Sequence, residues 1–249
     1  MAKKNHGPTP SLRRRLGRWL RVARRPWTWP GNRRREQRRR ALESKDGFDA
    51  THGTETTAPL PGLNYGATPV RTFRRIMEAI PTPLDDCAFV DLGSGKGRAL
   101  LLASEHPFRT IIGVEHSPEL HAVAGRNLAK FLPPTGRADR FQLRCEDAAD
   151  FVSTSWPEAD DVLLFLYCPF PSELLRQVCA ALQPHAEAGQ RISIAFVNPN
   201  RHMERVFSDW PQLHCLARFE PPDQALAAYE SFAIYSTGSS TDSFPGPAR

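Results

Sequence analysis

Short apolar runs alternate along this chain with longer stretches in which apolar residues recur at every third or fourth position. Runs of that length suit strands, and the longer period suits helices with one buried face. We therefore predict strands at 88–92, 110–115, 141–145, 161–167 and 191–197, with 216–220 and 232–236 as a closing hairpin-like pair. The helices expected between them cover 68–80, 97–105, 117–131 and 172–182.

Three of the predicted helix ends depend on specific residues. Thr68 suits the N-cap of a helix whose first residue is Pro69, and Ser117 before Pro118 predicts a second start of the same kind. Pro184 is expected to end the fourth helix, because proline lacks the amide hydrogen that a helix interior requires.

Strands that alternate with helices predict an α/β fold, here a doubly wound, mostly parallel seven-stranded sheet with helices on both faces. Residues 162–167 are apolar throughout, as expected of a strand covered on both faces. Ligands of such sheets bind beyond the carboxyl ends of the strands, near the point where the strand order reverses. A functional site is therefore expected in the segments that follow the strands.

The charge of the chain changes sign between its two parts. Residues 1–40 hold 15 Lys or Arg and one acid, which leaves 18 Lys or Arg and 26 acids for the rest. We predict a basic, flexible arm at 1–40, a polar lid over the site at 41–67, a globular domain at 68–237 and a disordered tail at 238–249. The arm suits the phosphates of nucleic acid or an anionic membrane surface; a solvated extension or an organellar transit peptide stays open.

The five cysteines form no C-x-x-C pair and have no histidine at zinc-ligand spacing. That pattern predicts free thiols and no metal site, and it suits a reducing cytoplasm better than a disulfide framework. No apolar run approaches the length of a transmembrane helix, and no apolar region follows the basic N-terminus as it does in a secretory signal.

The segment 89–98, FVDLGSGKGR, leads from an apolar strand through a glycine turn into a helix. Glycines there allow positive φ and close contact between a ligand and the main chain. A phosphate-binding P-loop needs Ser or Thr after its lysine, whereas Gly97 follows Lys96, and the G-x-G-x-G spacing differs from the dinucleotide motif. Asp91 would repel a pyrophosphate but attract an ammonium group.

S-adenosylmethionine meets these demands, because it carries no phosphate and has a cationic amino-acid end. We predict that Asp91 serves this end while Gly93, Gly95 and Gly97 form the turn. Glu115, after the second strand, could accept hydrogen bonds from both ribose hydroxyls. Asp147 with Ala148, after the third strand, could hold the adenine amino group, and the alternative for Asp147 is a helix N-cap.

These three sites, in this order and spacing, resemble the cofactor-binding signature of class I S-adenosylmethionine-dependent methyltransferases over roughly residues 65–200. Residues 89–128 are similar to a largely uncharacterised bacterial group of these enzymes. More distantly, Tyr65-Gly66-Ala67-Thr68-Pro69 resembles a segment of protein-lysine methyltransferases. The resemblance implies a seven-stranded sheet with a reversed last strand, and it implies that Tyr65 and Thr68 lie over the methionine end of the cofactor.

The acceptor side is expected after the fourth strand, where related enzymes carry Asn or Asp, then Pro, then an aromatic residue. Here the candidates are Tyr167, Cys168, Pro169 and Phe170. Cys168 stands at the polar position although it is a poor hydrogen-bond partner. The catalytic residue is unknown; the candidates by position are His52, Glu55 and Asn198, for each of which a loop contact is the plainer interpretation.

The leading hypothesis is methyl transfer to a macromolecule, either a protein lysine or RNA, because the basic arm suits a large anionic partner. A small-molecule acceptor stays open, since the cofactor site says nothing about it. The alternative from another class is a catalytically inactive binding module of the same fold, tethered to nucleic acid. The intact acids and glycines disfavour it, and Cys168 mildly favours it.

Overall fold

The structure is a computed structural model that describes residues 47–57, 65–80, 83–132, 138–167 and 171–238. The predicted arm at 1–40 lies outside these ranges, as do Cys168, Pro169, Phe170 and the tail beyond 238. The helices in the described ranges are α3 (Phe48–His52), α4 (Val70–Ala79), α5 (Arg98–Ala103), α6 (Pro118–Phe131), η1 (Ala138–Arg140), α7 (Ala148–Thr154), α8 (Ser172–Glu187), α9 (Arg201–Ser208) and α10 (Gln224–Glu230). The strands there are β1 (Cys87–Leu92), β2 (Thr110–Val114), β3 (Phe141–Arg144), β4 (Asp161–Tyr167), β5 (Arg191–Val197), β6 (His214–Phe219) and β7 (Phe232–Ser236).

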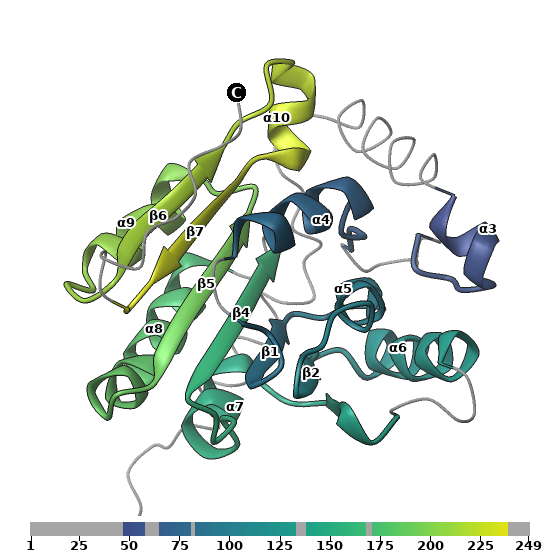
Figure 1. The fold of residues 1–249 in the computed structure, drawn as a ribbon, viewed down its shortest axis with the longest axis horizontal. Helices are drawn as coiled ribbons and strands as arrows, with labels where there is room; N and C mark the ends of the chain where they lie inside the picture. The colour runs from purple at the N-terminus through teal and green to yellow at the C-terminus, as the bar shows by residue number, and fades with distance from the viewer. Residues whose placement is uncertain (1–46, 58–64, 81–82, 133–137, 168–170, 239–249) are drawn as a thin grey trace, which may run out of the picture.

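Seven strands of the described chain form one sheet in the order β3-β2-β1-β4-β5-β7-β6 (Figure 1). Strands β1 to β5 pair in parallel, whereas β7 runs antiparallel to both of its neighbours. The doubly wound, mostly parallel sheet and its reversed last strand are therefore confirmed. The strand order reverses between β1 and β4, so the turn after β1 lies at the expected ligand position.

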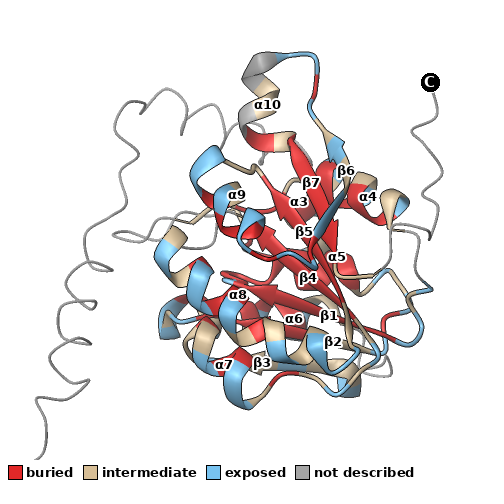
Figure 2. Ribbon diagram, turned by 90° about the vertical axis from the view of Figure 1, so that its left-hand side faces the viewer, coloured by how far each residue is buried: buried red, intermediate tan, exposed pale blue. Residues whose placement is uncertain are grey.

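Helices cover both faces of this sheet, and the central strands lie buried between them (Figure 2). Residues of α7, α8 and α9 belong to the core on one face, and residues of α4, α5 and α6 belong to the core on the other. Leu164 and Leu166 of β4 face the first core, whereas Leu163 and Phe165 face the second. This two-sided burial explains why the sequence of β4 is apolar from residue 162 onward.

Two of the predicted helix ends are wrong. Helix α4 begins at Val70 with Pro69 as its N-cap, so Thr68 does not cap it; Thr68 is instead buried beside the glycine turn. Pro184 lies inside α8, which continues to Glu187. A proline this close to the end interrupts little, because Ala188 N–H still donates to Pro184 O at 3.0 Å and Gly189 follows with φ 100°. The start of α6 at Ser117 and Pro118 is confirmed.

Smaller differences lie at the sheet margins. Strand β3 ends at Arg144, so Cys145 is outside it, and its residues are only partly covered, as suits an edge strand. The helices α3, α7, α9 and α10 have no counterpart among the predicted elements. Cys87, Cys145, Cys179 and Cys215 are free thiols, as expected. Among the described residues, no helix is long and apolar enough to cross a membrane.

Candidate functional site

The turn between β1 and α5 has the backbone that its glycines were expected to provide. Gly93, Gly95 and Gly97 all have positive φ, at 83°, 55° and 81°, where residues with a side chain are strained. The amides of Gly93 and Ser94 donate to Val114 O at 2.8 and 3.0 Å. The turn is thereby held against the carboxyl end of β2, and its main chain lies at the edge of the sheet.

Asp91, near the end of β1, is a buried acid with a cavity beside it. Its exposed fraction is 4%, and no described residue forms a hydrogen bond with its carboxyl group. The cavity has a volume of about 20 Å³, which is room for about one water molecule. Burial raises the pKa of Asp91 well above its ordinary value, and the nearby charge of Glu115 raises it further. A cation in the cavity would relieve that unfavourable burial.

The other walls of this cavity include three residues that were predicted from the sequence. Tyr65, Thr68 and Tyr167 line it together with Asp91, so the lid segment and the end of β4 meet at the acid. The Tyr65 ring lies directly on the turn, because a Cβ atom added at Gly95 would lie closer than 3.0 Å to it. In this structure the group packed against Gly95 is therefore Tyr65.

Glu115 follows β2 and joins the glycine turn to the start of α6. Its Oε2 accepts from the amide of Gly95 at 2.9 Å, and its Oε1 accepts from the amide of Ser117 at 2.7 Å. Burial raises the pKa of Glu115, and the two amide bonds only partly oppose that shift. Each carboxylate oxygen has a second acceptor site, so Glu115 can still bind hydroxyl groups beside the turn.

Asp147 caps the N-terminus of α7, which was the alternative interpretation of this residue. Its Oδ1 accepts from the amides of Ala149 and Asp150 at 2.8 and 3.3 Å, and Ala148 is buried beside it. These two bonds use only one of its carboxylate oxygens. The adenine contact predicted for Asp147 and Ala148 therefore stays a prediction.

We expect Asp147→Ala to lower the free energy of unfolding by about 1 kcal/mol, because a capping oxygen is lost. Asp147→Ser keeps such an oxygen and should retain the stability, while its affinity for S-adenosylhomocysteine should fall with the loss of the carboxylate. Thermal unfolding and calorimetry of both variants test this. If Asp147→Ser binds S-adenosylhomocysteine as tightly as the wild type, Asp147 caps α7 and does not contact the cofactor.

The three residues considered as catalytic candidates do not line the cavity beside Asp91. His52 packs against Phe48 and Phe131, with Nδ1 at 2.9 Å from Phe48 O. Glu55 is exposed and pairs with Lys130 at 3.2 Å. Asn198 follows β5 with φ 54°, and its amide donates to Ser231 O at 2.7 Å. These contacts do not test a catalytic role, so for all three residues that role stays a hypothesis from the sequence.

Two cations of the glycine turn were not assigned a role from the sequence. Lys96 and Arg98 have exposed fractions of only 2% and 1%. Both side chains interact with residues 47–57, in which Asp49 accompanies four threonines and one glutamate. That density of hydroxyl groups around one acid was a possible signal of a buried ionic network. The positions of these residues in the sequence, however, do not indicate which cations they contact.

We compared the chain with known proteins. No protein-family model and no curated protein matches it. Solved structures that it resembles include the methyltransferase domain of a bacterial protein, CtHen1 (14% identity, 67% of this chain and 96% of that chain, TM-score 0.49). Others are a ribosomal protein L11 methylase from Lactobacillus delbrueckii subsp. bulgaricus (13%, 66% and 74%, 0.45) and a SAM-dependent O-methyltransferase from Thermotoga maritima (18%, 68% and 64%, 0.46). Identities this low relate folds rather than activities.

Proposed function

We propose that this protein binds S-adenosylmethionine at the turn between β1 and α5 and transfers its methyl group to an acceptor. The observation that carries the proposal is Asp91, a buried acid with no hydrogen-bond partner among the described residues, facing a cavity at the switch point of the sheet. Such an acid selects a cationic ligand and disfavours a phosphate. S-adenosylmethionine carries both of its positive charges, on the sulfonium and the ammonium group, in its methionine part.

The same geometry supports a role for each of the neighbouring groups. Asp91 would hold the ammonium group of the methionine end, and Glu115 would accept the ribose hydroxyls while its amide bonds keep it in place. Tyr65 and Tyr167, which line the cavity, would exclude water from the sulfonium. Methyl transfer needs a nucleophile in line behind the sulfonium, so the protein contributes mainly orientation.

For the acceptor, we propose a macromolecule, either a protein lysine or RNA. The support is the charge of residues 1–40, which suits a large anionic partner. Tyr167 lies at the end of β4 in the cavity beside Asp91, so an acceptor group would approach from that side. A lysine acceptor would have to lose its proton before attack.

Calorimetry with S-adenosylhomocysteine tests the cofactor site. We expect the wild-type protein to bind it and Glu115→Ala to bind about ten to a hundred times more weakly, because hydrogen bonds to a charged group contribute about 1.5–3 kcal/mol. The control is Glu187→Ala, an exposed acid at the end of α8, which should bind like the wild type. Equal affinity in the two variants would contradict the assignment of Glu115.

Transfer of a radiolabelled methyl group into separated protein and RNA fractions tests the acceptor. We expect label in one of the two fractions. Label confined to small molecules would contradict a macromolecular acceptor. Cofactor binding with no transfer to any fraction would favour the binding module over the enzyme.

A further inference from the structure

Asp49 is the centre of a dense hydrogen-bond network in residues 47–57, which we call the cover. Its carboxylate accepts from the hydroxyls of Thr54, Thr56 and Thr57 at 2.5–2.7 Å and from the amides of Thr56 and Thr57 at 2.9 and 2.7 Å. Burial by itself would raise the pKa of Asp49, but the threonine bonds outweigh it and hold the pKa well below its ordinary value. The carboxylate therefore stays charged inside the cover.

Arg98, the first residue of α5, joins this network to the glycine turn. Its Nε donates to Thr56 Oγ1 at 2.6 Å, and its Nη2 lies 3.7 Å from Asp49 Oδ1. The guanidinium carbon lies 5.0 Å from the centre of the Phe48 ring. A buried cation therefore meets a half-buried acid and an aromatic face, a set of contacts that an exposed ion pair lacks.

Lys96 and Asn127 form a second link between the cover and the turn. Lys96 Nζ donates to Glu55 O at 3.3 Å and lies 5.6 Å from the centre of the Tyr65 ring. Asn127 donates to Lys96 O at 3.0 Å and accepts from the amide of Glu55 at 2.9 Å. The main chain of the cover and that of the turn are thus bridged by one side-chain amide.

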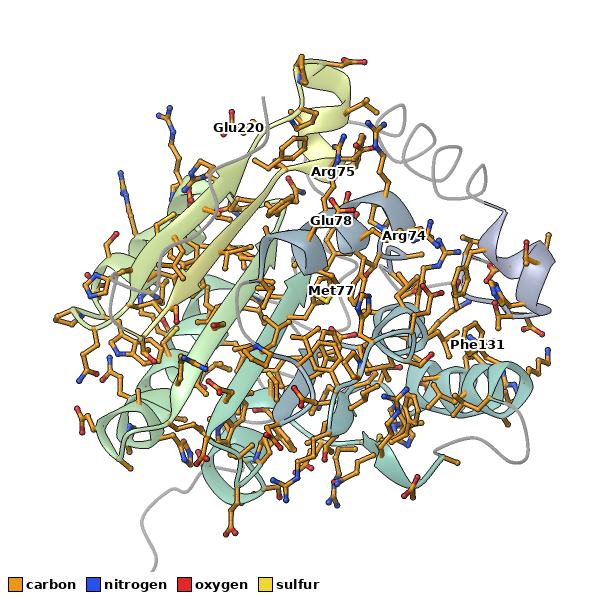
Figure 3. The ribbon with its side chains drawn as sticks, in the orientation of Figure 1. Arg74, Arg75, Met77, Glu78, Phe131 and Glu220 are labelled. Carbon is orange, nitrogen blue, oxygen red and sulfur yellow. The ribbon has the colours of Figure 1, made fainter. Side chains whose placement is uncertain are left out.

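Aromatic contacts with α6 hold α3 in place at the start of the cover. Phe131, labelled in Figure 3 at the end of α6, lies 5.9 Å from Phe48 and 4.8 Å from His52, measured between ring centres. In Figure 1 α3 lies beside α5 and α6. The cover therefore has apolar contacts as well as polar ones.

We propose that Lys96 and Arg98 are positioning residues that fasten the cover over the glycine turn, and that the fastened cover retains the bound cofactor. The inference rests on the proposed function for the identity of that cofactor. Both cations donate hydrogen bonds to residues of the cover. By holding the cover, they keep residues 47–57 and the Tyr65 ring against the turn that the cofactor must contact.

The consequence is kinetic. Cofactor release requires the cover to separate from the turn, which breaks the Asp49–Arg98 network. Weakening that network should therefore speed dissociation more than it slows association. A merely structural network would change the stability of the domain without changing the rate of release.

The test measures the dissociation rate of S-adenosylhomocysteine together with amide hydrogen exchange. Asp49→Asn should release the ligand at least ten times faster than wild type, with faster exchange in residues 47–57 and unchanged exchange in β4 and β5. Thr56→Val, a milder change, should shift both measurements in the same direction. The control Lys130→Gln breaks the exposed pair with Glu55, and its dissociation rate should stay within about twofold of wild type, because exposed pairs contribute little.

Three other results would contradict the proposed role of the cover. Faster exchange in the cover with an unchanged dissociation rate would overturn the retention role. Faster exchange throughout β4 and β5 in both variants would make the network a support of the whole fold. A wild-type protein that binds no S-adenosylhomocysteine would remove the proposed function, and the role of the cover with it.

Discussion

Asp91→Asn is expected to make the protein more stable while it weakens S-adenosylmethionine binding at least tenfold. The acid is buried without a hydrogen-bond partner among the described residues, and its charged form is disfavoured there by burial and by the nearby charge of Glu115. Asparagine has the same shape and no charge. It relieves that penalty, but it cannot neutralise the cationic end of the cofactor. Opposite changes in stability and affinity are characteristic of residues kept for function.

Thermal unfolding and calorimetry check this prediction, with Asp86→Asn as the matched control. Asp86 is an exposed acid immediately before β1, at the opposite end of the same strand. Its replacement should leave both measurements close to wild type. A less stable Asp91→Asn protein with undiminished affinity would show that Asp91 supports the fold and not the ligand.

The raised pKa of Asp91 also gives this prediction a pH dependence. The ordinary pKa of the carboxyl group is 3.8, and the folded protein raises it well above that value. Between the two values the folded state holds a proton that the unfolded state has released, so the contribution of Asp91 to stability falls as pH rises. The stability advantage of Asp91→Asn should therefore grow from about pH 4 upward. A pH-independent difference in melting temperature would contradict the assignment.

Gly95→Ala is expected to lower both stability and cofactor affinity by more than its backbone angle alone explains. A residue with a side chain at φ 55° is disfavoured by about 1–2 kcal/mol. In addition, the new Cβ would lie closer than 3.0 Å to the Tyr65 ring, so that ring must move. We expect the free energy of unfolding to fall by about 2–4 kcal/mol. The strained backbone angle and the displacement of the Tyr65 ring should contribute similar amounts.

Gly53 provides the matched control, because its φ is +66° and a Cβ there would meet nothing within 4 Å. Gly53→Ala should show the backbone term alone. The excess in Gly95→Ala should largely disappear in a protein that also carries Tyr65→Ala, since the two positions are coupled by contact. Denaturant unfolding of the four variants, including Tyr65→Ala alone, measures that coupling. Additive losses would mean that Tyr65 does not lie against the turn in solution.

Much of the fold could be predicted because the relevant information is local. The apolar run of β4 reports its burial on both faces, and the strand, glycine turn and helix at 88–103 occupy one continuous segment. The positive φ values of Gly93, Gly95 and Gly97 follow from the same segment. Helices α3, α7, α9 and α10 were missed; they have between five and eight residues, and short helices depend on tertiary packing more than on their own propensity.

The difference between local sequence preference and tertiary packing also explains the errors at Thr68 and Pro184. Thr68 before Pro69 has the local chemistry of a helix start, but the chain uses Thr68 to line the cavity beside Asp91. Pro184 has the local chemistry of a helix end, but the last turn of α8 closes on its carbonyl group. In both cases a contact made by the folded chain outweighed a preference of a few residues.

The strand–helix alternation, the glycine turn and the acids at the ends of β1 and β2 could be read from the sequence, because each is encoded within a few consecutive residues. What Lys96 and Arg98 contact, in contrast, depends on how distant segments of the chain pack together. Their partners, Glu55 and Thr56, lie 41 and 42 positions earlier in the chain, and no periodicity connects segments so far apart. Burying both cations requires hydrogen-bond partners from another segment, and the packing of α3 on α6 selects which segment supplies them.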